Sequence, residues 1–204
     1  FKKIPGNPIV YWISENYRDI FLKQKLLQVG DAKQGLATSD NNRFVRNWTE
    51  VSFIRIGLNM GSELESTKSE KFWFPYNKGG EKRKWYGNQD YLVNWYNAGF
   101  DIRNFERAVV RNPTYYFKES ISWGLINSGG SSFRFYPKGF IYDVGGMSYF
   151  PKYNVKAILG MLNTKLYNQL TKVLNPTVNL QIGDVASLPY SVPSKSESII
   201  NDAV

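Results

Sequence analysis

Residues 153–174 read Tyr-Asn-Val-Lys-Ala-Ile-Leu-Gly-Met-Leu-Asn-Thr-Lys-Leu-Tyr-Asn-Gln-Leu-Thr-Lys-Val-Leu and carry the clearest periodic pattern of the chain. Apolar side chains recur at helical spacing from Val155 to Val173, which predicts an amphipathic helix with one buried face. Asn175-Pro176 follows, and proline cannot continue a helix because it lacks the amide donor. This helix needs an apolar surface to pack on, and the preceding residues supply one.

Two stretches rich in aromatic and β-branched residues, 115–125 and 133–144, precede the helix and are joined by the turn-rich segment 127–132. They predict a pair of strands. Further strands are predicted at 48–58, 72–76 and 177–182, and further helices at 15–29, capped by Ser14, and at 88–98, capped by Asn88. The order has no regular βαβ alternation, which favours an α+β fold with a mixed, mostly antiparallel sheet and flanking helices.

The composition limits the catalytic and metal-binding chemistry open to the chain. Because the 204 residues contain no Cys and no His, disulfides, zinc–thiolate sites and histidine-dependent nucleophiles are excluded. The acidic residues show no metal-ligand spacing, so we expect no catalytic, cofactor or metal site in this chain. Its net charge of +9 favours an anionic partner. No apolar run of transmembrane length occurs and the chain begins at Phe1, so we expect a cytoplasmic piece of a longer protein with no membrane partner.

Residues 78–88, the basic segment, alternate cations with planar rings around Gly79-Gly80. Lysine and arginine neutralise phosphates, aromatic rings stack on bases, and Asn88 has an amide that can pair with adenine. The pattern indicates nucleic-acid binding. A solvated basic hairpin over an aromatic mini-core is the alternative.

A second polar cluster spans residues 34–43 and extends to Arg46, with amide, hydroxyl and guanidinium groups close together in sequence. Such groups read base edges and bind phosphates, although they also form self-bonded turns. Arg134 lies on a predicted strand and adds a further candidate phosphate contact. The predicted DNA-contacting residues are Arg43, Arg46, Lys78, Lys82, Arg83, Lys84, Trp85, Tyr86, Asn88 and Arg134.

Two motifs come close to catalytic or cofactor-binding patterns. Asn112-Pro-Thr-Tyr115 approaches the Asn-Pro-Pro-Tyr motif of amino-methyltransferases, but Thr114 replaces the second proline and no methyl-donor motif lies upstream. We interpret it as the loop that leads into a strand. Asp143-Val-Gly-Gly146 is not followed by a helical pattern, as a dinucleotide-binding turn would require, and it predicts a β-bulge or a tight turn.

Several stretches resemble the region that follows the catalytic domain in adenine-specific DNA methyltransferases of the bacteriophage-exclusion (BREX) type, the PglX family. The most specific is Trp73-Phe-Pro-Tyr-Asn-Lys-Gly-Gly80, and the others are 1–12, 35–48, 81–88, 116–123, 135–146, 162–165 and 175–189. The C-terminal stretch is also similar to the specificity regions of fused type II restriction–modification enzymes and of type I specificity subunits.

This resemblance implies a target recognition domain at residues 1–193, followed by a frayed tail or linker at 194–204. It also implies S-adenosylmethionine as the methyl donor of the parent enzyme and adenine N6 as the acceptor, with no catalytic centre in this part. The implied partners are double-stranded DNA, the methyltransferase domain of the same chain and further subunits of the defence system.

Two other hypotheses remain open at this stage. The basic and aromatic surface could dock a partner subunit or an inhibitor that mimics DNA, since Trp, Tyr and Arg are common in protein interfaces. A catalytic fragment such as a nuclease would need an acidic cluster that the sequence does not supply.

Overall fold

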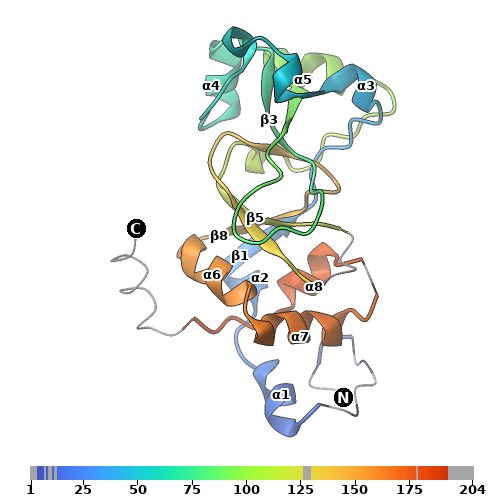
Figure 1. The fold of residues 1–204 in the computed structure, drawn as a ribbon, viewed down its shortest axis with the longest axis vertical. Helices are drawn as coiled ribbons and strands as arrows, with labels where there is room; N and C mark the ends of the chain where they lie inside the picture. Colours follow the sequence, from blue (N-terminus) through green and yellow to red (C-terminus); the bar gives the residue numbers. More distant parts are fainter. Residues whose placement is uncertain are drawn as a thin grey trace.

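The computed structural model describes residues 4–6, 8, 11, 13–125, 130–177 and 179–192. They form an elongated body of two lobes, each built on a four-stranded sheet (Figure 1). All strand pairs but one are antiparallel. The α+β class with mostly antiparallel pairing is therefore confirmed, although there are two sheets where one was predicted. The predicted tail at 194–204 lies outside the described residues.

The lower lobe in Figure 1 contains α7, which is longer than the other described helices. Its sheet has the order β1 (Gly30–Lys33), β8 (Ser148–Pro151), β5 (Ser120–Trp123) and β6 (Phe133–Tyr136). Its helices are α1 (Glu15–Ile20), α2 (Leu26–Val29), α6 (Val155–Leu162), α7 (Lys165–Leu174) and α8 (Ile182–Ala186). Helix α6 packs on β5, β6 and β8, and α8 packs on β1, so the helices cover the sheet and bury its apolar side chains.

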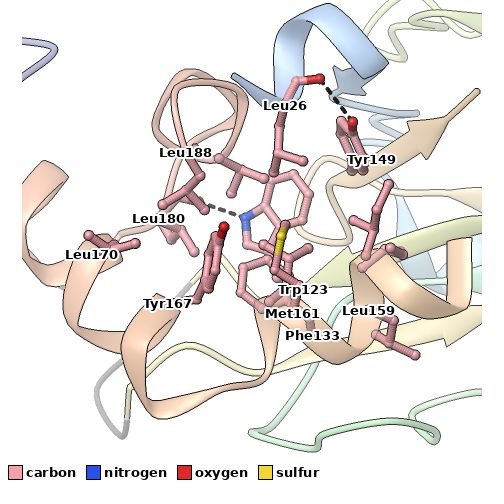
Figure 2. Close-up of a cluster of buried hydrophobic side chains, with 14 of the residues drawn as sticks. Leu26, Trp123, Phe133, Tyr149, Leu159, Met161, Tyr167, Leu170, Leu180 and Leu188 are labelled. Carbon is pink, nitrogen blue, oxygen red and sulfur yellow. Dashed lines mark hydrogen bonds between the residues drawn. The ribbon is translucent and has the colours of Figure 1, made fainter. Parts of the chain in front are cut away.

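Trp123 lies within the buried cluster of this lobe, where Figure 2 shows its ring among leucine, phenylalanine and methionine side chains. Its indole Nε1 donates to the carbonyl oxygen of Leu180 at 2.9 Å, and the hydroxyl of Tyr149 donates to the carbonyl oxygen of Leu26 at 2.9 Å. Buried polar tips need such partners, so both bonds fix how the C-terminal and N-terminal segments lie on the sheet.

The upper lobe has a sheet of order β2 (Val45–Asn47), β4 (Tyr91–Asn94), β3 (Trp73–Asn77) and β7 (Ile141–Tyr142). Among the described strands, β3 and β7 are the one parallel pair. The helices of this lobe are α3 (Asn41–Phe44), α4 (Glu63–Lys68) and α5 (Tyr96–Arg103), with two 3-10 turns, η1 (Trp48–Glu50) and η2 (Phe53–Arg55). Its separate core includes Phe74, Trp95 and Phe117.

The helix predicted over 153–174 is confirmed, but it is divided into α6 and α7. Asn163 and Thr164 lie between the two helices, and the side chain of each forms hydrogen bonds that interrupt the helix. The Asn163 side chain accepts from the Phe133 amide at 3.1 Å and donates to the Phe133 carbonyl oxygen at 2.8 Å. The Thr164 hydroxyl caps α7 by accepting from the Tyr167 amide. Bonding to β6 therefore outweighs helix continuation at this point.

Other boundaries differ from the predictions. Residues 48–58 contain η1 and η2 in place of a strand, because Glu50 accepts from the Asn47 amide and Asn47 caps the turn. Residues 91–94 form strand β4 in place of a helix, since they lie between β2 and β3. Over 177–182 the described residues form no strand, and α8 already begins at Ile182. The helix over 15–29 is capped by Ser14 as predicted, but it is interrupted after Ile20.

The predicted strand pair is confirmed in part. Strands β5 and β6 are antiparallel neighbours with Ser122 opposite Arg134. Residues 133–144, predicted as one strand, contain both β6 and β7, which belong to different sheets. The chain turns between them at Gly139, whose φ of +102° is accessible mainly to glycine. This crossing joins the two lobes covalently close to the basic segment.

Candidate nucleic-acid interface

The basic segment leaves the upper lobe at the end of β3, reaches the lower sheet, and returns to β4. At the lower sheet it runs along β6, which is an edge strand. The Trp85 amide donates to the Phe133 carbonyl oxygen at 2.9 Å, and the Phe135 amide donates to the Trp85 carbonyl oxygen at 2.9 Å. In Figure 1 this green loop crosses in front of the lower sheet. The segment is therefore an ordered attachment to a sheet edge.

Arg134 lies beneath the segment and is fully buried, with 0% of its surface exposed. Its Nη2 donates to the Gly79 carbonyl oxygen at 2.8 Å, and its Nη1 lies 3.4 Å from the carbonyl oxygens of Glu81 and Arg83. The planar fork of a guanidinium suits several acceptors at once. The predicted phosphate contact of Arg134 does not fit this burial, because the carbonyl oxygens of the segment surround the charge. Arg134 instead holds the segment in shape.

Lys84 and Asn88 also support the segment. The Lys84 ammonium donates to the Asn163 carbonyl oxygen at 2.9 Å, at the C-terminal end of α6, where a cation is favourable for the helix dipole. The Asn88 amide donates to the Glu81 carbonyl oxygen at 2.8 Å, and the Tyr136 hydroxyl donates to the Asn88 carbonyl oxygen at 2.9 Å. The predicted base contact of Asn88 would require its bond to Glu81 to break.

Six consecutive residues of the segment, from Glu81 to Tyr86, are exposed. Trp85 and Tyr86 are 53% and 65% exposed, and Lys82 and Arg83 are exposed beside them. Two cations and two rings are thus presented together on a backbone fixed from below. This arrangement can neutralise phosphates and stack on bases.

The upper lobe contributes Arg43 and Arg46. Arg43 is exposed, and its guanidinium lies 4.9 Å from the ring centroid of Phe44. Arg46 donates to the Val45 carbonyl oxygen at 2.7 Å and lies 5.5 Å from the ring centroid of Trp73. Arg43 is therefore the more available of the two for a phosphate.

Lys78 connects the basic segment with the polar loop. Its ammonium lies 3.0 Å from Oδ1 of Asn41 and 3.4 Å from a carboxylate oxygen of Asp143. Lys78 and Arg46 both line a depression of about 490 Å³, together with Asn41, Asn42, Val45, Asn47, Glu50 and Tyr91. The structure thus brings together two predicted cations that are 32 positions apart in sequence.

A buried polar network joins the two sheets next to the basic segment. The Asn77 amide, at the end of β3, donates to the Ser122 hydroxyl at 2.7 Å and to the Gly146 carbonyl oxygen at 3.0 Å. Asp143 accepts from the Tyr76 hydroxyl at 2.6 Å and from the Gly145 amide at 2.7 Å. The sequence Asp143-Val-Gly-Gly146 therefore forms a tight turn, as predicted, and serves to join the lobes.

Burial, followed by the neighbouring Asp143 carboxylate, raises the pKa of Tyr76 well above its usual value. Burial raises the pKa of the other buried tyrosines, Tyr116, Tyr136, Tyr142, Tyr149 and Tyr167, as well. A tyrosine with a raised folded pKa contributes stability below the unfolded pKa of about 10, and this contribution is lost as pH rises above it, because the unfolded chain ionises first.

We therefore expect the free energy of unfolding in urea to fall steeply above about pH 10. In a Tyr76→Phe variant the fall should be shallower by about 1.4 kcal/mol per pH unit above pH 10. The slope of the unfolding free energy against pH reports the ionisation of Tyr76, whereas the absolute stability also includes the hydrogen bond that phenylalanine lacks. The comparison therefore uses the slopes of the two proteins. Identical slopes would contradict the assignment of Tyr76.

The Asn112 motif has a structural role. Asn112 has a left-handed φ of +50° and its amide donates to the Gln34 carbonyl oxygen at 2.9 Å. Pro113–Tyr115 form a 3-10 turn, η3, before β5. The motif thus lies in the loop that leads into a strand, as interpreted from the sequence.

The sequence reasoning missed part of the depression. Asn47 and Tyr91 were assigned to no site, and Tyr91 was placed on a helix. The sequence gives only a weak signal for this pair, because Tyr91 lies opposite Asn47 only once β2 pairs with β4. Phe53 and Ile54 were also missed, and they are 73% and 74% exposed on η2.

Within the described parts of the chain, no group of three or more acidic residues lies close enough together to hold a metal ion. Across those same residues, no helix has the length and apolar character needed to cross a membrane.

Comparison with known proteins finds the chain similar to a part of two adenine-specific methyltransferases. Along its full length it is 36% identical to the adenine-specific methyltransferase PglX of Lacticaseibacillus casei (strain Zhang) and 37% identical to the adenine-specific methyltransferase BrxX of Escherichia coli O9:H4 (strain HS). No protein-family model matches the chain. The resemblance inferred from the sequence is confirmed, and the chain corresponds to a part of the BREX-type methyltransferases. It spans only 18% and 17% of these two relatives.

Proposed function

We propose that this chain is the DNA target recognition region of an adenine-N6 DNA methyltransferase that acts in phage defence, with the recognition domain spanning residues 1–193. The observation that carries the proposal is the ordered basic segment, in which Arg134 lies buried beneath while Lys82, Arg83, Trp85 and Tyr86 face outward. The similarity to adenine-specific methyltransferases supplies the substrate class. Catalysis, with S-adenosylmethionine as donor, is assigned to the remaining part of such an enzyme, in the cytoplasm.

Phosphate contacts position a protein on DNA, whereas contacts to base edges provide specificity. In this chain we assign positioning to Lys82 and Arg83 of the basic segment and to Arg43 of the upper lobe. Lys78, Lys84 and Arg46 contribute positive charge while bonded to neighbouring groups. Trp85 and Tyr86 are assigned to stacking or to insertion between base steps.

The first test is a fluorescence-anisotropy titration of the chain with labelled duplex DNA at several salt concentrations. If Lys82, Arg83 and Arg43 each neutralise one phosphate, the logarithm of the association constant should fall against the logarithm of salt with a slope of about −2.7. Absence of binding even at low salt would contradict the proposal for this chain.

A protein-docking function is the second candidate, favoured by the exposure of Phe53 and Ile54 on η2. Large apolar side chains on a rigid turn are typical of interfaces. The partner at this apolar turn would be the methyltransferase domain or another defence subunit. Binding to such a protein should depend weakly on salt and should be lost in a Phe53→Ser/Ile54→Ser variant that still binds DNA.

A further inference from the structure

The depression between the two predicted polar clusters has amide groups on its wall. Asn41 and Asn42 come from α3, Asn47 from β2, and Lys78 from the end of β3. Its volume of about 490 Å³ falls within the range of ligand-binding clefts. Each amide can both donate and accept, so the question is which of them is still available to a ligand.

Two of these amides are already bonded. Oδ1 of Asn41 accepts from the Thr38 hydroxyl at 2.9 Å and from the Lys78 ammonium at 3.0 Å. Oδ1 of Asn47 accepts from the Thr49 amide at 3.1 Å and from its hydroxyl at 2.9 Å. Both side chains therefore maintain the shape of the wall.

Asn42 differs from them. Its side chain is exposed, and its amide forms no hydrogen bond with any described residue. Its backbone is nevertheless fixed, because its carbonyl oxygen accepts from Arg46. The result is a donor–acceptor pair without a described partner on an ordered wall. It is next in sequence to the exposed Arg43 and to Asn41, which Lys78 contacts.

We propose that Asn42 is a base-reading residue that recognises adenine in duplex DNA. This inference rests on the proposed function and deepens it. An asparagine amide matches the N6 donor and N7 acceptor of adenine in the major groove, whereas arginine and lysine prefer guanine. The neighbouring cations would hold the phosphates on either side, and Asn42, which is neutral, would supply sequence information. Asn88 is a weaker candidate, since its amide is bonded to Glu81.

The test is selection of bound duplexes from a randomised pool, with the wild-type chain, an Asn42→Ala variant and a Gln169→Ala variant. Gln169 is an exposed amide on α7 and serves as the matched control. The wild type and the control should select adenine at a shared position. Asn42→Ala should lose about 5- to 150-fold of discrimination at that one position, while the other positions and the salt dependence remain unchanged.

Three outcomes are distinguishable. An unchanged preference in Asn42→Ala would overturn the assignment of Asn42 while leaving DNA binding intact. Binding of the wild type with no sequence preference would also overturn it. Failure of the wild type to bind any duplex at low salt would overturn the proposed function, and this inference with it.

Discussion

An Arg134→Met variant is expected to lose about 2–4 kcal/mol of stability and to bind DNA more weakly than the wild type. Methionine keeps much of the side-chain volume but removes the donors that serve the carbonyl oxygens of Gly79, Glu81 and Arg83. Gly79 is buried, so its carbonyl oxygen would be left without a partner, and leaving such a group unpaired costs more than an average hydrogen bond contributes. DNA affinity should fall in proportion to the fraction of molecules that lose the ordered segment.

Two measurements separate these effects. Urea unfolding gives the loss of stability, and hydrogen exchange at the Trp85 and Phe135 amides reports whether the segment stays paired with β6, since both amides form that pairing. Lys138→Met is the matched control, because Lys138 is exposed and its loss removes the same charge. Wild-type protection of Trp85 in Arg134→Met would show that Arg134 does not hold the segment.

A Lys82→Gln/Arg83→Gln variant is expected to bind duplex DNA about 60-fold more weakly at about 0.1 M salt, with little change in stability. Each phosphate contact contributes about 0.9 to the salt slope, so the loss of two should flatten it by about 1.8. Both residues are exposed at the outer side of the basic segment, and surface substitutions of this kind usually change stability by less than about 0.5 kcal/mol.

A Lys165→Gln/Lys172→Gln variant provides the control for total charge. Both lysines are exposed on α7 in the lower lobe, and their loss changes the net charge equally. If binding follows the net charge alone, the two variants should weaken it to the same degree. Equal salt slopes would therefore reject the basic segment as the phosphate-contacting surface and support a diffuse electrostatic attraction.

The local signals in the sequence predicted the features that depend on neighbouring residues. Ser14 caps α1 through its own side chain, and the periodic stretch that ends at Asn175 is helical except at one break. The basic segment and the polar loop could be recognised because cations, amides and rings are close together in sequence. Capping and helical periodicity act over three or four residues, so a linear pattern contains them.

The predictions failed where distant residues decide the conformation. Residues 91–94 have helical spacing of apolar residues, but β2 and β3 pair with them on both sides. Residues 48–58 have strand-like composition, yet the side chains of Asn47 and Glu50 cap η1, and η2 follows without a side-chain cap. Strand preference depends strongly on packing partners, which a single sequence does not reveal.

The sequence by itself determined the α+β class, the excess of positive charge and the absence of thiol and imidazole chemistry. Only the tertiary structure decided which polar groups remain available. Arg134 and Arg83 look alike in the sequence, but one is buried under carbonyl oxygens and the other is exposed. Asn42 and Asn41 are neighbours, but one amide is free of described partners and the other is bonded. The physical reason is that desolvation and hydrogen-bond partners come from residues far along the chain, so availability for a ligand is a property of the folded molecule.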